Sequence, residues 1–296
     1  MNEQELTRIL SRFVALVSTR LPDDVIEILR SAAASADDLE QKQLFRIMFD
    51  NLERARLEKI PICQDTGTPY FHVRLGANSP FMNCIERCLR KAVEIATSEI
   101  PLRPNAVDPF TGRNTGTNVG KNIPWIDYEL VPDSDKLEIF LHMAGGGSSL
   151  VGRSLVLKPL ERIEGMSEIL IDTLINNGIN ACPPLFLGIG IGATMEISAI
   201  LAKRALLKPV GERSEDPRIA ELEEILLEDL NRLAIGIQGM GFGKSILDIH
   251  IEYSARHPTT FAVGISANCW VFRRGVLVLY PNGEFEIPTH KEADIS

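Results

Sequence analysis

Apolar side chains recur every three or four residues through the first 58 positions, the spacing of a helix with one buried face. The pattern is clear in residues 4–20 ("QELTRILSRFVALVSTR") and 23–35 ("DDVIEILRSAAAS"), and it continues in 37–57 ("DDLEQKQLFRIMFDNLERARL"). We therefore expect a helical N-terminal part over residues 1–58.

Strand-like alternation of apolar and polar residues begins after this part. It occurs in residues 70–76 ("YFHVRLG"), 125–131 ("WIDYELV") and 136–143 ("KLEIFLHM"). The last two runs are separated by "PDSD", whose turn-forming residues predict a hairpin. A second hairpin is predicted for residues 275–287 ("GVLVLYPNGEFEI"), because an Asn-Gly pair lies between its two apolar runs.

Helical patterns return between these strands, most clearly in residues 216–236, where Asp216 can cap the helix and Pro217 suits its first turn. The chain shows no internal repeat and no flexible linker, and residues 59–296 are expected to form an α+β part. The sequence predicts an α+β fold, a helical N-terminal region followed by mixed β-sheets packed with helices. We expect a single domain over residues 1–296.

Composition narrows the functional classes. The 296 residues are 45% hydrophobic and carry a net charge of -9, which disfavours binding to nucleic acid or anionic membrane. The start of the chain lacks the pattern of a signal peptide, and no apolar run approaches the roughly 18 residues of a membrane span. We expect a cytoplasmic protein with reduced thiols, and five cysteines, an odd number, also argue against a disulfide framework.

Two of the cysteines suit a structural role. Cys84 and Cys88 lie four residues apart on a predicted helix beside Leu89 and Val93. Two thiols at that spacing could bind a metal, but no further ligand cluster accompanies them. We interpret them as core or boundary residues.

The other three cysteines each lie at the end of a loop or strand: Cys63 in "ICQDTG", Cys182 in "ACPPLF" and Cys269 in "SANCWVF". Their wide separation means that only the fold could bring them together. Buried core residues are the simpler interpretation. Three shared thiolates would instead suit an iron–sulfur cubane whose fourth iron has no protein ligand and can act as a Lewis acid.

A glycine motif offers a competing function. Residues 185–196 ("LFLGIGIGATME") follow a strand and open a helix, which resembles a dinucleotide-binding fingerprint. The fingerprint is imperfect (Gly188-x-Gly190-x-x-Ala193), and no second strand with a ribose-binding acid follows. We favour a glycine turn that lets the helix approach the strand and fixes Cys182 upstream.

The motifs together resemble a known family. "PICQDTG", "NACPP", "GIGIGATMEISAILAKRAL", "NRLAIGIQG", "ARHPTT" and "NCW" resemble the α-subunit of the class I iron–sulfur fumarase and tartrate dehydratase family over nearly the whole chain. Within it, "PLRPNAV", "MAGGGSSLVGRS" and "CWVFRRG" are more similar to the L(+)-tartrate dehydratase branch. Two-subunit fumarases tend to have a "KGxGSEN" pattern at the glycine loop. Here Ala144 precedes Gly145, and Ser149-Leu150 ends the motif.

The resemblance implies a set of site residues. It implies that a [4Fe–4S] cluster with one iron lacking a protein ligand is held by Cys63, Cys182 and Cys269. It implies catalytic roles for Asp65 and His257, and substrate-binding roles for Gln64, Arg103 and Gly146. Taken singly, each has a plainer interpretation: Arg103 as a surface charge, His257 as a loop residue, and the Gln64-Asp65 pair or the glycine run as a turn.

The implied reaction is dehydration of a 2-hydroxy dicarboxylate, with L(+)-tartrate giving oxaloacetate and water. Further substrate contacts and the base would come from a separate β-subunit, in an α₂β₂ heterotetramer. Arg273, Arg274 and Lys244 could serve the site or that partner. The alternatives are a fumarase α-subunit, a non-catalytic iron–sulfur protein and, last, a NAD-dependent oxidoreductase.

Overall fold

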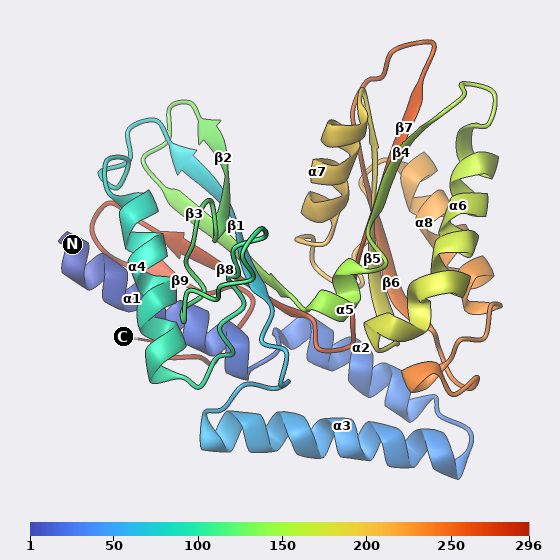
Figure 1. Cartoon of the computed structure of the whole chain (residues 1–296), viewed down its shortest axis with the longest axis horizontal. Helices are drawn as coiled ribbons and strands as arrows, with labels where there is room; N and C mark the ends of the chain where they lie inside the picture. The colour runs from blue at the N-terminus through green and yellow to red at the C-terminus, as the bar shows by residue number, and fades with distance from the viewer. Residues whose placement is uncertain (296) are drawn as a thin grey trace. The chain divides into compact units, whose positions relative to one another are not determined.

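The structure is a computed structural model and describes residues 1–295 (Figure 1). Its α-helices are α1 (Glu3–Thr19), α2 (Asp23–Ala34), α3 (Leu39–Glu58), α4 (Ile85–Glu99), α5 (Gly146–Ser149), α6 (Arg162–Asn177), α7 (Met195–Ala205) and α8 (Pro217–Asn231). Its strands are β1 (Thr68–Gly76), β2 (Trp125–Val131), β3 (Leu137–Ala144), β4 (Arg153–Leu157), β5 (Leu185–Gly192), β6 (Ile246–Tyr253), β7 (Phe261–Asn268), β8 (Arg273–Leu279) and β9 (Phe285–Glu286). Two 3₁₀ turns complete the description, η1 (Gly178–Ala181) and η2 (Ile237–Gly239). Helices occupy the N-terminal part and mixed sheets follow, so the predicted α+β fold is confirmed.

The chain forms two compact units, each built on its own sheet. Unit 1 comprises Met1–Asp23, Met48–Gly145 and the chain from Arg273 onward, and unit 2 comprises Asp24–Ile47 and Gly146–Phe272. Each unit therefore combines segments that are far apart in the sequence. No helix within residues 1–295 is long and apolar enough to cross a membrane.

Unit 1 contains a five-stranded sheet in the order β2-β1-β3-β8-β9. Helices α1 and α4 lie side by side against it (Figure 1), and their apolar stripes meet the inward side chains of β1, β3 and β8. Phe13 of α1, Leu89 of α4 and Val73 of β1 are fully buried in this core. Gly275 lets α1 approach β8, because a Cβ there would lie 2.6 Å from Cγ2 of Val17.

The predicted hairpin between β2 and β3 is wrong. β1 lies between them, pairing in parallel with β2 and antiparallel with β3. The "PDSD" turn instead wraps around the end of β1: the amide of Gly76 donates to the carbonyl of Lys136, and that of Asn78 donates to the carbonyl of Ser134. Gly76 permits this path, since a Cβ there would lie 2.5 Å from the Ser134 carbonyl oxygen. The second predicted hairpin is confirmed, because β8 and β9 pair antiparallel.

Unit 2 contains a four-stranded sheet in the order β4-β7-β5-β6. One face of β5 packs in an apolar core with α6 and α8, through residues such as Leu187, Ile189, Leu170 and Leu226. The cap predicted for α8 is present, since the side chain of Asp216 accepts from the Arg218 amide and Pro217 is in the first turn.

The glycines of "LFLGIGIGATME" lie within β5, not in a turn after it. They face α7: a Cβ at Gly188 would lie 2.1 Å from the Ala202 carbonyl oxygen, and one at Gly190 would lie 2.0 Å from that of Ser198. The predicted close packing of helix and strand is therefore confirmed, and the predicted turn is wrong. Because helix α7 packs directly against these glycines, they do not form a phosphate-binding loop.

Candidate active site

The "CQDTG" loop of unit 1 occupies the short connection between the end of α3 and the start of β1. Asp65 shapes it, because Oδ1 of its carboxylate accepts a hydrogen bond of 3.0 Å from the Gly67 amide. Gly67 has a positive φ of 81°, and a Cβ there would lie 2.8 Å from the carbonyl carbon of Met143 in β3. The loop is thus a tight turn pressed against the sheet, with Gln64 exposed and Cys63 half-buried.

A buried arginine holds the main chain of this loop. Arg273, the first residue of β8, is only 1% exposed, and its Nη1 donates to the carbonyl oxygen of Asp65 at 2.7 Å. The sequence left the role of Arg273 open. Its position assigns it to the interior of unit 1, where it supports the loop that carries Cys63 and Asp65.

The segment that carries Arg103 lies directly beside the "CQDTG" loop. The Thr66 hydroxyl donates to the carbonyl oxygen of Arg103 at 3.3 Å, and the Asn105 side chain donates to that of Gly67 at 3.0 Å. Asn118 adds a third link, because its Nδ2 donates to the same Arg103 carbonyl at 3.2 Å. The side chain of Arg103 is exposed while its main chain is fixed, so the structure brings these two predicted site segments together.

The glycine run, residues 145–147, begins where β3 ends. A Cβ at Gly145 would lie 2.8 Å from Oδ2 of Asp65, so only a bare main chain fits against this carboxylate. Gly146 follows as the exposed first residue of α5. A Cβ at Gly147 would lie 2.5 Å from the Asn180 carbonyl oxygen, two residues before Cys182. Gly145 and Gly147 are thus each required by a close contact within their own unit.

Cys182 and Cys269 lie at one edge of the unit 2 sheet. Cys182 follows η1 with a positive φ of 55° and is exposed, three residues before β5. Cys269 directly follows β7, and the pairing of Phe186 with Asn268 places the start of β5 beside the end of β7. The two thiols therefore belong to neighbouring strand ends.

Two buried polar side chains fix the main chain at Cys269. Its amide donates to the Ser148 hydroxyl at 3.2 Å and to Oδ1 of Asn268 at 3.1 Å. The Ser148 hydroxyl also bonds Oδ1 of Asn268 at 3.2 Å. This bond links the glycine run to the end of β7.

The thiol donors suit an iron–sulfur cluster in their chemistry. Cys63, Cys182 and Cys269 form no disulfide, are partly or fully exposed, and are located in loops, where thiolates can point out of the core. Cys63 belongs to unit 1 and the other two to unit 2. Within residues 1–295 no group of three or more His, Cys, Asp or Glu side chains is arranged as a metal site.

The remaining cysteines are placed as expected. Cys88 is 2% exposed in the core of unit 1, and Cys84 packs against that core. Burial and the neighbouring Cys88 raise the pKa of the Cys84 thiol to about 11. A thiol with so high a pKa is a poor ligand at neutral pH.

His257 lies away from Cys182 and Cys269 within unit 2. It is exposed in the loop before β7, where Nδ1 contacts the Thr259 hydroxyl at 2.7 Å. Cys269 follows the other end of β7, an eight-residue strand, so more than roughly 20 Å of strand separates the two within unit 2. The structure does not bring His257 to the sheet edge that carries the two cysteines.

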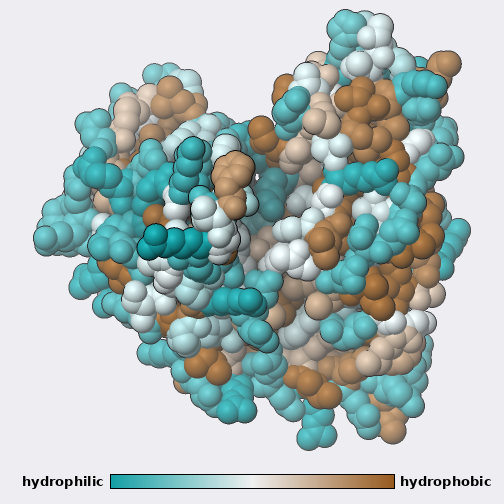
Figure 2. Space-filling view, in the orientation of Figure 1, coloured by the Kyte–Doolittle hydropathy of each residue, from teal (hydrophilic) through white to brown (hydrophobic). Residues whose placement is uncertain are grey.

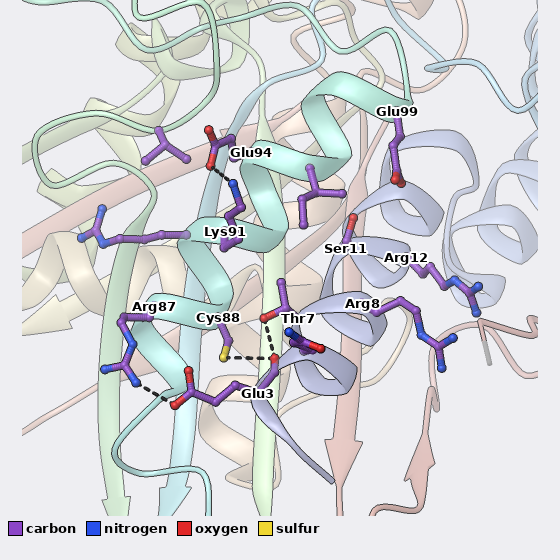
Figure 3. A pocket seen from close by; sticks show the side chains of 14 residues that line it. Glu3, Thr7, Arg8, Ser11, Arg12, Arg87, Cys88, Lys91, Glu94 and Glu99 are labelled. Atoms are coloured by element: carbon purple, nitrogen blue, oxygen red, sulfur yellow. Dashed lines mark hydrogen bonds and ion pairs between the residues drawn. The ribbon is translucent and has the colours of Figure 1, made fainter.

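A separate groove of about 930 Å³ lies on α1 and α4 of unit 1 (Figure 3). Two ion pairs border it, Arg87 with Glu3 and Lys91 with Glu94. None of the predicted site residues lines this groove.

Apolar side chains are also exposed on unit 2. Ile171, Ile175 and Ile179 are 37%, 63% and 55% exposed at intervals of four residues, along α6 and into η1. Figure 2 shows hydrophobic residues gathered over α6. Such a stripe is typical of a surface that another chain covers.

Several residues of the site were not predicted from the sequence: Thr66, Asn105, Asn118, Ser148 and Asn268. All are polar, and all except Asn118 lie inside the quoted motifs, which was the only available signal. Their burial depends on contacts between distant segments, which the motifs do not reveal.

Comparison with known proteins supplies independent information. Residues 7–278 match the family model described as Fumarate hydratase (Fumerase). The chain is 42% identical over 286 residues to the L(+)-tartrate dehydratase subunit alpha of Escherichia coli (strain K12), covering 97% of this chain and 94% of that protein. The Shigella boydii subunit of the same name gives the same values. A Methanocaldococcus jannaschii protein with the same name, provisionally assigned, is 39% identical over 86% of this chain and 91% of its own length.

Proposed function

We propose that this chain is the α-subunit of an iron–sulfur L(+)-tartrate dehydratase. The chain belongs to the fumarate hydratase (fumerase) family and is a hydro-lyase subunit. The reaction converts L(+)-tartrate to oxaloacetate and water. Support for tartrate comes from the names of the similar proteins and from the motifs "PLRPNAV" and "MAGGGSSLVGRS". A fumarase α-subunit remains the alternative, because the matching family model carries the fumarate hydratase description.

The proposed cofactor is a [4Fe–4S] cluster held by Cys63, Cys182 and Cys269, with one iron lacking a protein ligand. When bound, it would supply a Lewis acid for the departing hydroxyl. The support is the donor chemistry: three thiols in loops and outside any disulfide, two of them at neighbouring strand ends.

The observation that carries the proposal is the pair of hydrogen bonds that joins the Asp65 and Arg103 segments, from Thr66 to the Arg103 carbonyl and from Asn105 to the Gly67 carbonyl. The two segments carry the Asp65 carboxylate, which could accept a proton, and the Arg103 guanidinium, which could bind a carboxylate. This combination suits a dicarboxylate substrate. The planar guanidinium of Arg103 would hold one substrate carboxylate through two hydrogen bonds.

Other groups of this chain have distinct tasks in the proposal. The amide side chain of Gln64 would bind a substrate oxygen, and the Gly146 amide would approach the substrate where no side chain obstructs it. Asp65 would hold or accept a proton. Loss of a proton from carbon next to a carboxylate builds negative charge, which Arg103 and the glycine amides would stabilise.

His257 was predicted as a second catalytic group, and its position gives that role no support within unit 2. We retain it as a proposal with a simple test. His257→Ala should lower turnover of the assembled enzyme without changing its iron content. Unchanged turnover would remove His257 from the site.

We further propose that the whole chain works as one α-subunit domain in the cytoplasm, in an α₂β₂ assembly with a β-subunit that completes the site. The subunit name of the similar proteins and the exposed isoleucine stripe of α6 support a partner. The chain alone should show little turnover, and adding the β-subunit should restore it.

Iron and acid-labile sulfide, measured per chain in anaerobically prepared protein, test the cofactor. We expect about four irons, the content of a [4Fe–4S] cluster, and their loss in Cys63→Ser, Cys182→Ser and Cys269→Ser. Cys84→Ser is the matched control and should keep its iron. No iron in the wild type, or full iron in the three variants, would overturn the proposal.

Turnover of the assembled α- and β-subunits on L-tartrate, malate and mesaconate then tests the substrate. A preference for L-tartrate supports the proposal, and a preference for malate selects the fumarase alternative. A cluster-loaded pair that is inactive on every dicarboxylate would leave a non-catalytic iron–sulfur protein.

A further inference from the structure

Asn118 is a buried amide in the loop between α4 and β2. It is only 1% exposed, although residues 114–116, which shortly precede it, are at the surface. A buried amide costs free energy unless its donors and acceptor are satisfied. Three hydrogen bonds satisfy this side chain, all of them within unit 1.

The three bonds connect the Arg103 segment to a helix. Nδ2 of Asn118 donates to the Arg103 carbonyl at 3.2 Å and to the Thr97 hydroxyl at 3.1 Å, while Oδ1 accepts from the Asn105 amide at 2.9 Å. Thr97 lies in α4, and its own hydroxyl donates to the Val93 carbonyl at 2.7 Å. The donors and the acceptor of the amide are used in one orientation only, so reversing it would break all three bonds.

The result is a fixed main chain that carries an exposed side chain. The Arg103 carbonyl accepts from both Asn118 and Thr66, and the preceding Leu102 is 5% exposed in the core. The Arg103 guanidinium itself is at the surface. The positions available to the guanidinium therefore depend on the Arg103 main chain, which Asn118 fixes by a hydrogen bond.

We propose that Asn118 is a positioning residue for substrate binding, which fixes the Arg103 main chain and so aims its guanidinium at a substrate carboxylate. This inference rests on the proposed function. Asn118 does not touch the substrate. Its effect is to reduce the conformational freedom that Arg103 loses when substrate binds.

The test compares three variants of the chain assembled with its β-subunit. Asn118→Leu keeps the volume and removes all three bonds. Asn118→Asp keeps the acceptor for the Asn105 amide and removes the two donors. Thr97→Val is the matched control. Of the three Asn118 bonds it removes only the one to α4, together with the bond of the Thr97 hydroxyl to the Val93 carbonyl, and it leaves both bonds to the Arg103 segment.

Three readouts are needed: iron content, kcat and KM for L-tartrate, and hydrogen exchange of the Asn105 amide. For Asn118→Leu we expect unchanged iron, KM raised about tenfold or more, kcat changed by less than about threefold, and faster exchange. Asn118→Asp should raise KM with less effect on exchange, and Thr97→Val should change KM by less than about twofold.

The outcomes separate this inference from the proposed function. Unchanged exchange of the Asn105 amide in Asn118→Leu overturns the positioning role whatever the enzyme's activity. Unchanged KM with faster exchange also overturns it, and so does loss of iron in both Asn118 variants, which would indicate a general structural role. A wild-type pair without turnover refutes the proposed function, while the exchange measurement still tests whether Asn118 holds the loop.

Discussion

Arg273 and Asp65 are 208 residues apart in the sequence, and Nη1 of the arginine donates a hydrogen bond of 2.7 Å to the carbonyl oxygen of the aspartate. The arginine begins β8 and is almost fully buried, so the loop containing Asp65 is held from inside unit 1. This contact explains how a five-residue turn can present a cysteine and a carboxylate in fixed directions.

Replacing Arg273 should lower the stability of the protein and loosen the loop that contains Asp65. Arg273→Ala leaves the Asp65 carbonyl without this donor and removes a large buried side chain, and we expect a loss of about 2–4 kcal/mol in the free energy of unfolding. Urea denaturation measures this. Arg54→Ala is the control, because Arg54 forms an exposed pair with Glu58 on α3 and should change stability by less than about 0.5 kcal/mol. Equal effects of the two substitutions would contradict the assigned role.

Gly145→Ala should affect catalysis more than stability. The new Cβ would lie 2.8 Å from Oδ2 of Asp65, so this carboxylate must move while the backbone can remain in place. We expect kcat of the assembled enzyme to fall by about tenfold or more, with iron content unchanged and stability changed by less than about 1 kcal/mol.

Gly120→Ala is the matched control, since its Cβ would meet no atom closer than 3.5 Å. Its kcat should equal that of the wild type. A Gly145→Ala enzyme with full activity would show that the position of the Asp65 carboxylate does not matter for turnover.

Gly190→Ala tests the interpretation of the β5 glycines. A Cβ there would lie 2.0 Å from the Ser198 carbonyl oxygen, and backbone cannot move aside as a side chain can. We expect a loss of more than about 3 kcal/mol or failure to fold, seen as a lower Tm or loss of soluble protein. A folded variant with normal Tm that lost binding of NAD present in the wild type would favour the dinucleotide alternative instead.

Buried His290 should make the protein less stable in mild acid. Burial lowers its pKa from 6.5 to about 4, so the unfolded chain binds a proton more readily than the folded one between these values. The contribution of His290 to the free energy of unfolding is fully present above pH 6.5. As the pH falls toward 4, the protein loses this contribution, which is on the order of 3 kcal/mol.

The His290→Gln variant isolates this effect. Denaturation midpoints at pH 7 and pH 4.5 should differ less for the variant than for the wild type, because other titrating groups are common to both. Identical pH dependence of the two proteins would show that His290 does not contribute.

Local patterns were sufficient for much of the fold and for the family. The three N-terminal helices, the cap at Asp216 and the hairpin of β8 and β9 depend on contacts between near neighbours in sequence, and periodicity and turn chemistry report those directly. The motifs around the three loop cysteines likewise carried the resemblance that the family match confirms.

The strand order, and the hydrogen bonds that hold the site residues in place, became known only from the tertiary structure. The "PDSD" turn has the chemistry of a hairpin, but the chain closes it around β1, because strand neighbours are chosen by the packing of whole segments. Arg273, Asn118 and Ser148 act through hydrogen bonds that join residues far apart in sequence. The sequence therefore predicted which residues carry the chemistry. The fold decided what holds them, because the burial of a polar side chain depends on every segment around it.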